Sequence, residues 1–192
     1  MTNKIKLIVG LGNPGPKHLM DRHNAGFWFT DLLCDDFATT FKLDSKYQAK
    51  VATASIANNV VKIIQPQTFM NLSGTSTAKL ANFFKYNAKE ILVIHDELDL
   101  PVGDVKLKLG GGHAGHNGLR DIIAKLGSNN FYRLRVGIGH PGHKDLVSPY
   151  VLSKPKKDEQ ELIIDAIHAG LRNIKNIVNG EMDKAAKEIQ TK

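Results

Sequence analysis

The sequence predicts an α/β fold: a single domain over residues 1–192, with a central twisted mixed β-sheet flanked by helices. Short apolar segments rich in β-branched residues alternate along the chain with segments of helical period. The chain has 192 residues, of which 42% are hydrophobic and 23% are charged, enough apolar material for one sizeable core. No linker-like stretch and no internal repeat divides the sequence, so one globular domain is expected.

The first part of the chain supplies a strand, a helix and a hairpin. Residues 4–12 are predicted as a buried strand, because a β-branched apolar run ends there in glycine. A helix is expected over residues 24–38, capped by its first residue, an asparagine. Residues 47–56 and 60–65 are expected to pair as a hairpin that turns at Asn58-Asn59, since asparagine tolerates positive φ.

The middle of the chain continues the alternation. Residues 74–86 predict a helix with leucine and phenylalanine at core spacing. Residues 91–94 are all apolar, which is typical of a strand buried on both faces. Residues 104–109 and 131–139 alternate between polar and apolar side chains, and a glycine-rich loop opens a helix between them, over residues 117–126.

The chain is expected to turn helical again after Pro149. Asp158 and Glu161 have the spacing of a capping box. An apolar stripe at helical spacing then ends at Gly180 and consists of Ile163, Ile167, Leu171, Ile174 and Val178.

The charge balance points to a polyanionic partner. Lys and Arg number 26 against 19 Asp and Glu, which gives a net charge of +7 and a pI of about 9.4. The single cysteine, Cys34, excludes a disulfide framework and is expected to be buried and inert. The apolar run near the N-terminus is too short for a signal peptide or a membrane span, so a soluble, cytoplasmic protein without membrane association is expected.

Two glycine-rich strings are candidate binding loops. Residues 10–15 satisfy G-x-G-x-x-G after a strand, but Pro14 and Pro16 stand where a pyrophosphate-binding helix would begin. NAD binding is therefore disfavoured, and a tight structural turn stays open as the alternative. Residues 110–118 hold five glycines with two histidines and an asparagine before a helix, a natural site for an anion or a carbonyl group.

Histidines and carboxylates allow two kinds of chemistry. His113-x-x-His116 and His140-x-x-His143 have usable metal-ligand spacing, although a flexible glycine loop aims such ligands poorly. A metal-dependent hydrolase is therefore kept as an alternative. His23 in the first loop and Asp96 after a buried strand suggest instead a general base that acts on water.

Basic residues flank the second glycine-rich string. Lys106 and Lys108 share one face of a predicted strand, and Arg133 and Arg135 share one face of another. Basic residues on strands commonly lie on the solvent-exposed face and have no binding role. Their place beside the glycine loop favours phosphate binding.

Six segments, in order and at matching spacing over residues 5–142, resemble the bacterial peptidyl-tRNA hydrolase family. Beyond residue 142 the chain resembles the family only in its helical character. The segments are VGLGNPG (9–15), RHNAG (22–26), PQTFMNLSG (66–74), HDELDLP (95–101), KLGGGHAGHNG (108–118) and RVGIGHPG (135–142).

The resemblance implies a monomeric hydrolase of α/β architecture, without a metal, a cofactor or an obligate protein partner. Such enzymes cleave the ester between a peptide and the 3′ ribose of tRNA in peptidyl-tRNA, recycling tRNA from stalled translation. The resemblance implies that His23 is the general base, that Asp96 orients it, and that Asn71 and Asn117 bind the substrate carbonyl and the oxyanion. It implies that Asn13 binds the peptide backbone and that Phe69, Met70 and His116 line the same cleft. It also implies that Lys108 and Arg135 bind the tRNA 5′ phosphate and that Lys144 is a further tRNA contact.

One position departs from the family pattern. Near His18 the family commonly has a tyrosine, and we expect His18 at the edge of the substrate cleft, where it would meet the tRNA 3′ end differently. The competing hypothesis is an RNA-binding module without chemistry. Such a module has no use for a histidine base that faces an aspartate.

Overall fold

One mixed sheet organises the protein. The computed structural model describes residues 2–191, and within them seven strands pair in the order β2-β3-β4-β1-β5-β7-β6. Strands β4, β1, β5 and β7 are parallel, whereas β2, β3 and β6 run antiparallel to their neighbours. The bounds are β1 (Leu7–Gly10), β2 (Lys42–Asp44), β3 (Ala49–Ile56), β4 (Asn59–Pro66), β5 (Ile91–Glu97), β6 (Val105–Leu109) and β7 (Tyr132–Gly137).

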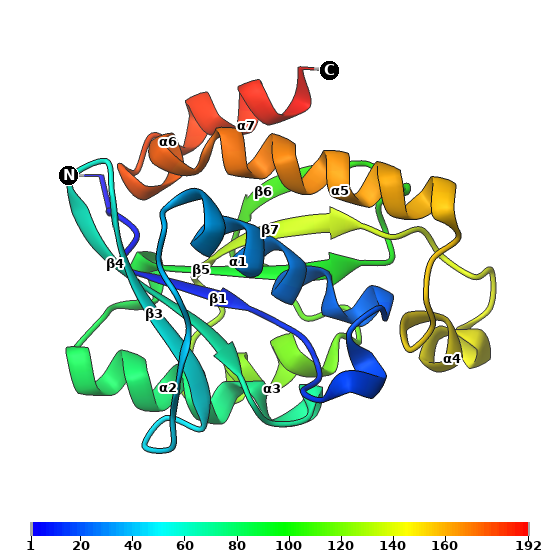
Figure 1. Ribbon diagram of the computed structural model, residues 1–192, viewed down its shortest axis with the longest axis horizontal. Helices are drawn as coiled ribbons and strands as arrows, with labels where there is room; N and C mark the ends of the chain where they lie inside the picture. Colours follow the sequence, from blue (N-terminus) through cyan, green and yellow to red (C-terminus); the bar gives the residue numbers. More distant parts are fainter. Residues whose placement is uncertain (1, 192) are drawn as a thin grey trace.

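Helices cover both faces of this sheet. The α-helices are α1 (Ala25–Asp36), α2 (Ser73–Phe84), α3 (Asn117–Leu126), α4 (Val147–Val151), α5 (Lys157–Arg172), α6 (Ile174–Val178) and α7 (Met182–Gln190). Short 3-10 turns are η1 (Pro16–His18), η2 (Arg22–Asn24), η3 (Met70–Leu72), η4 (Ala88–Glu90) and η5 (Lys144–Leu146). Figure 1 shows α1 and α5 on one side of the strands and α2 and α3 on the other. The predicted fold class is confirmed.

Each face of the sheet carries a hydrophobic core. Phe29 of α1 and Ile167 of α5 belong to one core, while Leu80 of α2 and Ile122 of α3 belong to the other. All four side chains are fully buried. Because β1 and β5 are covered on both sides, β1 and the first four residues of β5 are apolar throughout, as expected of central parallel strands, and the polar residues of β5 come at its carboxyl end.

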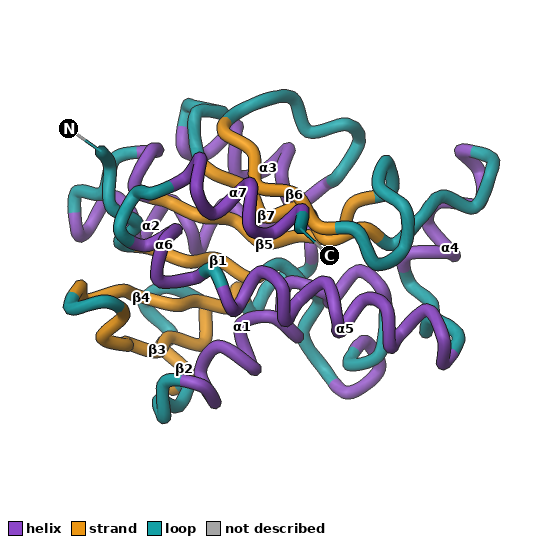
Figure 2. Tube along the Cα trace, turned by 90° about the horizontal axis from the view of Figure 1, so that it is seen from above, coloured by secondary structure: helices purple, strands orange, loops and turns teal. Residues whose placement is uncertain are grey.

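The order of the parallel strands determines where a site can form. The next parallel strand in the sequence after β1 is β4, which lies on one side of β1, and the one after that, β5, lies on the other side. Loops therefore diverge where the carboxyl ends of β1 and β5 meet, and such a switch point leaves a crevice at the sheet edge. In Figures 1 and 2, the helix α4 lies beyond this end of the sheet, apart from the other helices.

Helix α1 packs almost backbone to backbone on the strands at this point. A Cβ on Gly26 would lie 2.4 Å from Ile94 O and 2.4 Å from Leu11 N. A Cβ on Gly10 would lie 2.5 Å from Gly26 O. These two glycines therefore allow the close approach that brings η2, directly before α1, over the end of β5.

We expect Gly26→Ala to lower stability by about 1–3 kcal/mol, because rigid backbone atoms leave no room for the added methyl group. Thermal unfolding would show this as a fall in Tm of about 2–4 °C per kcal/mol. Gly112→Ala is the matched control for stability, since a Cβ there meets no atom within 4 Å and its φ is not positive. Equal Tm values for the two variants would contradict the close-packing argument.

Several predicted details are wrong for local reasons. Asn24 precedes α1, but its side chain makes no capping hydrogen bond and is bonded to the loop before it. The hairpin turns on Ala57 and Asn58, which have the positive φ values, and not on Asn58-Asn59. Helix α5 begins one residue earlier than the predicted capping box, and the bond at its start is donated by Lys156 N to Glu159 Oε2, not formed between Asp158 and Glu161.

The C-terminal helical region is also divided differently from the expectation. The apolar stripe is interrupted at Asn173, which separates α5 from α6. Its residues nevertheless face the core as predicted, since Ile163, Ile174 and Val178 are buried. The short strand β2 and the helix α7 were not predicted.

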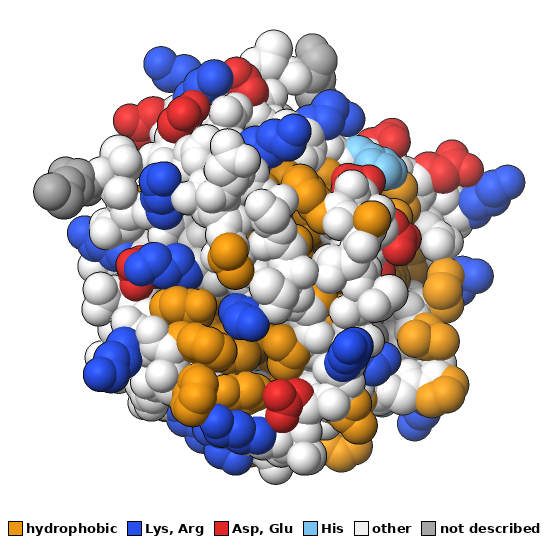
Figure 3. All heavy atoms as spheres, turned by 60° about the vertical axis from the view of Figure 1, so that its left-hand side comes forward, with side chains coloured by type: hydrophobic (Ala, Val, Ile, Leu, Met, Phe, Trp, Pro, Cys, Tyr) orange, Lys and Arg blue, Asp and Glu red, His pale blue; other side chains and the backbone are white. Residues whose placement is uncertain are grey.

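An aromatic and lysine cluster occupies the side of the molecule where α2 lies. Figure 3 shows hydrophobic side chains on this side interspersed with basic side chains. Phe83 and Phe84 are exposed, with the Lys46 ammonium 3.4 Å from the Phe83 ring centre and the Lys62 ammonium 5.3 Å from that of Phe84. Cation–π contacts of this kind stabilise exposed rings.

Candidate active site

A cavity of about 910 Å³ opens at the carboxyl ends of the parallel strands. It is lined by segments that are far apart in the sequence: the loop after β1, η2, η3, the end of β5, the glycine-rich loop before α3, and α4. Of the site residues expected from the sequence, those in its lining are Asn13, His23, Phe69, Met70, Asn71, Asp96, Lys108, His116, Asn117, Arg135 and Lys144.

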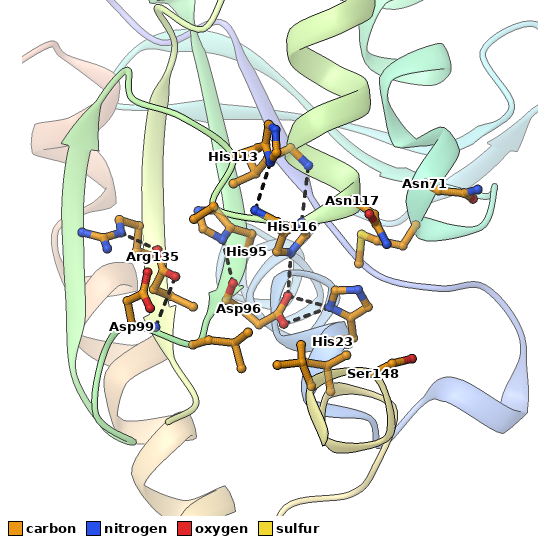
Figure 4. A pocket seen from close by; sticks show the side chains of 18 of the residues that line it. His23, Asn71, His95, Asp96, Asp99, His113, His116, Asn117, Arg135 and Ser148 are labelled. Carbon is orange, nitrogen blue, oxygen red and sulfur yellow. Dashed lines mark hydrogen bonds and ion pairs between the residues drawn. The ribbon is translucent and has the colours of Figure 1, made fainter. Parts of the chain in front are cut away.

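His23, Asp96 and His116 form a hydrogen-bonded trio at the base of the cavity (Figure 4). His23 Nδ1 lies 2.9 and 3.0 Å from the two carboxylate oxygens of Asp96, and His116 Nε2 lies 2.9 Å from Asp96 Oδ1. His116 Nδ1 accepts a hydrogen bond from Leu119 N, so its proton resides on Nε2 and is donated to Asp96. Among the described residues, His23 Nε2 has no hydrogen-bond partner.

The electrostatics of the trio favour a basic His23. Burial by itself lowers the pKa of His23, but the Asp96 carboxylate, the hydrogen bond to it and the charge of Asp21 together leave that pKa above its ordinary value. Burial also disfavours the Asp96 carboxylate, yet His23 and His116 hold the pKa of Asp96 far below its usual range. Asp96 is therefore ionised at neutral pH and keeps the Nδ1–H of His23 directed at itself.

A second hydrogen-bond chain holds one wall of the cavity. Asn24 Oδ1 accepts from Asn13 N at 2.8 Å, and Asn24 Nδ2 donates to Asn13 O at 3.0 Å. Asn13 Oδ1 in turn accepts from Met70 N at 2.7 Å. Because its oxygen is engaged there, Asn13 keeps its Nδ2–H₂ donors for other partners in the cavity.

Asn71 and Asn117 lie on the same side of the cavity in Figure 4. Asn117 is the first residue of α3, and its Oδ1 accepts from Arg120 at 3.2 Å, which leaves the Nδ2–H₂ group as the available donor. Asn71 belongs to η3 and is exposed, without a hydrogen bond to any described residue. Both amides can therefore donate to a substrate oxygen.

Cations line the opposite part of the cavity. Lys108 pairs in register with Arg133, and Lys106 with Arg135, so the four side chains share one face of the β6–β7 ladder. Arg135 Nε donates to Glu97 Oε1 at 2.7 Å, a partner that sequence reasoning missed. Lys108 is exposed and forms no ion pair within residues 2–191.

His18 is the predicted site residue that the structure does not bring into the cavity lining. It lies in η1, and its Nδ1 is 2.7 Å from Asp21 Oδ2. The carboxylate holds the ring against its own turn, three residues away. Sequence reasoning also missed the wall made by Val147, Ser148, Val151 and Leu152 of α4 and its C-terminal end, because no motif marks that helix.

The metal-ligand pairs expected from spacing are not assembled. His113, His140 and His143 each accept a hydrogen bond at Nδ1 from a backbone N–H two residues ahead, within their own loops. The trio His23, Asp96 and His116 is the group in the described chain whose ligand atoms lie within 4.8 Å of one another. These atoms are already joined by hydrogen bonds, and His116 could bind a metal through Nε2 only by giving up its bond from Leu119.

The fold and the site together define a class: a hydrolase of α/β architecture, whose cavity holds a histidine–aspartate pair, amide donors and a cationic rim. The family described as peptidyl-tRNA hydrolase matches residues 7–192. The chain belongs to the peptidyl-tRNA hydrolase family.

Similar proteins support this assignment over the full length of the chain. The peptidyl-tRNA hydrolase of Neisseria gonorrhoeae (strain NCCP11945) is 48% identical over 192 residues, covering 100% of both chains. That of Legionella pneumophila (strain Philadelphia 1) is 51% identical over 185 residues, covering 96% of this chain and 98% of its own. The crystal structure of peptidyl-tRNA hydrolase from Acinetobacter baumannii superposes with a TM-score of 0.96 at 44% identity, covering 100% of this chain and 97% of that one. The resemblance found in the sequence motifs is thus confirmed.

Proposed function

We propose that this chain hydrolyses peptidyl-tRNA with His23 as the general base, and the hydrogen bond between His23 Nδ1 and Asp96 carries this proposal. With Nδ1–H held by the carboxylate, Nε2 has a free lone pair that can take a proton from water. The water then adds to the ester carbonyl that joins the peptide to the 3′ ribose, the bond from the carbonyl carbon to the 3′ oxygen breaks, and the proton held by His23 passes to that oxygen. An ester with a ribose leaving group does not require a covalent intermediate, so a positioned water and a base suffice.

The amides supply the donors that the reaction needs. Negative charge develops on the carbonyl oxygen as water adds, and Nδ2–H₂ groups of Asn71 and Asn117 are available to stabilise it. Asn13, fixed by Asn24 and Met70, is suited to bind the peptide backbone next to the ester. Phe69 and Met70 contribute apolar surface beside it.

Lys108, Arg135 and Lys144 supply the contacts to the tRNA. The first two occupy neighbouring strands beside the glycine-rich loop, and we assign them to the 5′ phosphate. Lys144 in η5 extends the cationic surface toward α4. The basic composition of the chain, with a net charge of +7, agrees with a polyanionic substrate.

Turnover of labelled peptidyl-tRNA tests the function directly. Release of free peptide and intact tRNA at catalytic enzyme concentrations is expected, and it should persist after exhaustive chelation. Binding of tRNA without release at micromolar enzyme would instead support the RNA-binding module. Loss of activity on chelation, restored by a divalent ion, would support the metal-dependent alternative.

The pH dependence follows from the environment of His23. Because Asp96 and Asp21 raise its pKa above 6.5 against the effect of burial, the base is protonated and inactive at low pH. We expect kcat/KM for peptidyl-tRNA to rise with pH through a single ionisation whose midpoint lies above 6.5. A profile that falls or stays flat between pH 6 and 8 would contradict the assignment.

The salt dependence of tRNA binding reports the phosphate contacts. Lys108→Ala and Arg135→Ala should each reduce the slope of log K against log salt by about 0.7–0.9, the share of one phosphate contact. A minimal ester substrate without the tRNA body should be cut almost normally by both variants. Equal losses on long and short substrates would show that these cations serve the fold or the chemistry instead.

We further propose that the protein acts as a cytoplasmic monomer. Among residues 2–191, no helix combines the length and the apolar composition needed to cross a membrane. Sedimentation of the active enzyme at assay concentrations should give the mass of one chain, 21.1 kDa.

A further inference from the structure

The strongest unassigned feature near the site is Arg133, a buried cation whose acceptors are backbone carbonyls. Its side chain lies under the glycine-rich loop on the α2–α3 face of the sheet, and the residue is only 3% exposed. Nη1 donates to Gly112 O at 2.5 Å and Nη2 donates to Gly111 O at 2.6 Å. The guanidinium also packs 4.7 Å from the ring centre of Phe131.

This arrangement does not resemble an ordinary buried ion pair. Arg133 forms no salt bridge with any described residue, and the nearby acid Glu97 is bonded to Arg135. Burial lowers the pKa of Arg133 from its usual value, and the positive charge of Arg135 lowers it further. The Glu97 carboxylate partly offsets this, and arginine stays charged, so a positive charge without an ion-pair partner among the described residues is retained beside the cavity.

The two carbonyl bonds determine where the loop amides point. In a planar trans peptide, the C=O and the next N–H are antiparallel. Since Gly111 O and Gly112 O are turned toward Arg133, the N–H groups of Gly112 and His113 are turned away from it. Neither N–H has a hydrogen-bond partner among the described residues, and both residues line the cavity.

The loop backbone accepts this conformation only because of its glycines. Gly111 has φ +102°, a conformation that L side chains rarely adopt, and a Cβ there would lie 2.9 Å from Lys108 Nζ. Lys108 therefore lies directly over the peptide units that Arg133 holds. One phosphate group could accept from both free amides and from the Lys108 ammonium.

We propose that Arg133 is a positioning residue: by holding the carbonyls of Gly111 and Gly112, it presents the amides of Gly112 and His113, together with Lys108, to the tRNA 5′ phosphate. The inference rests on the proposed assignment of Lys108 and Arg135 to that phosphate. Arg133 borders the cavity but is only 3% exposed, and each of its Nη atoms is bonded to a loop carbonyl, so we assign it a supporting role and not direct binding of the phosphate.

The loss of Arg133 should not move the side chains that act on the ester. His116 is held by its backbone bond to His113 O at 2.8 Å, by Leu119 N at its Nδ1 and by Asp96 at its Nε2. Asn117 follows it as the first residue of α3. A change at Arg133 should therefore affect phosphate binding and leave the attack on the ester intact.

The test compares Arg133→Met and Arg133→Lys with Lys108→Ala, and uses Arg172→Met on α5 as the control for loss of a cation outside the cleft. Each is assayed on peptidyl-tRNA with a 5′ phosphate, on the same substrate after dephosphorylation, and on a minimal ester. We expect both Arg133 variants to raise KM for the phosphorylated substrate about 10-fold, the size of effect that follows from losing a hydrogen bond to a charged group. Their kcat and their activity on the minimal ester should stay near the wild-type values.

Two further readouts separate positioning from direct contact and from a purely structural role. The salt slope should stay unchanged in Arg133→Lys, whereas Lys108→Ala lowers it by about 0.7–0.9. The KM penalty should disappear on the dephosphorylated substrate. Lysine keeps the charge but cannot donate to both carbonyls in the planar geometry of a guanidinium, so it should not restore KM; if Arg133→Met does not fold, Arg133→Lys carries the test.

The outcomes distinguish failure of the Arg133 inference from failure of the phosphate assignment on which it rests. Wild-type KM in Arg133→Lys, a penalty independent of the 5′ phosphate, or a parallel loss on the minimal ester would each overturn the positioning role. If Lys108→Ala alone loses sensitivity to the 5′ phosphate, the phosphate assignment stands and the Arg133 inference is wrong. If Lys108→Ala is also indifferent to the phosphate, the proposed assignment itself fails.

Discussion

His23→Ala is expected to lose on the order of 10²–10⁴-fold in the rate of peptidyl-tRNA hydrolysis, the usual share of general-base catalysis. The imidazole is fixed by Asp96 at 2.9 Å, and its Nε2 is the group placed to accept a proton from water. Removal of the side chain leaves the amide donors and the cationic rim in place. The affinity for tRNA should therefore remain close to that of the wild type.

The measurement is single-turnover hydrolysis together with equilibrium tRNA binding. His168→Ala is the matched control, because His168 is exposed on α5 and does not line the cavity. The pH-dependent rise of the residual rate should also disappear in His23→Ala. If His23→Ala kept more than about a tenth of the rate, its loss would be far smaller than general-base catalysis contributes. His116 or His113 would then be the next candidate for the base.

Asp96→Asn is expected to lose on the order of 10²-fold or more, up to the roughly 10⁴-fold known for the same change in serine-protease triads. The carboxylate accepts hydrogen bonds from both His23 and His116, whereas an amide has only one oxygen to accept with. If the amide nitrogen faces His23, the imidazole must accept at Nδ1, and its proton then occupies Nε2. The base nitrogen is thereby blocked.

Because Asp96 acts through His23, the two changes should not be additive. The double variant His23→Ala/Asp96→Asn should be no slower than His23→Ala alone. The remaining activity of Asp96→Asn should show its pH midpoint shifted downward, since the negative charge that raises the pKa of His23 is gone. Asp36→Asn, at the exposed end of α1, is the control. An additive double variant would assign Asp96 a role independent of the base.

Local sequence signals were sufficient for the elements whose interactions are short in range. The helix over residues 117–126 is found with the predicted bounds, because a glycine-rich loop and a helical apolar pattern lie within that segment. The apolar strand at residues 91–94 was predicted but extends to Glu97. His95 and Asp96 are polar, and only the pairing of β5 with β7 keeps them in the strand.

Details that depend on competing partners could not be read from the sequence. Asn24 has the composition of a helix cap, but in the folded chain its amide is bonded to Asn13 across the loop. His18 was expected at the cleft, yet Asp21 draws its ring into η1. Both side chains had more than one possible hydrogen-bond partner, and the partner was selected by the surrounding backbone.

By itself the sequence determined the alternation of strands and helices, the family, and which residue types are present for base catalysis and phosphate binding. Only the tertiary structure decided which of them meet: that Asp96 is shared by His23 and His116, that Glu97 is bonded to Arg135, and that Arg133 lies beneath the glycine-rich loop. The physical reason is that these contacts join residues 20 to 73 positions apart. Such distances are closed only when parallel strands align their carboxyl ends, and no local propensity encodes that alignment.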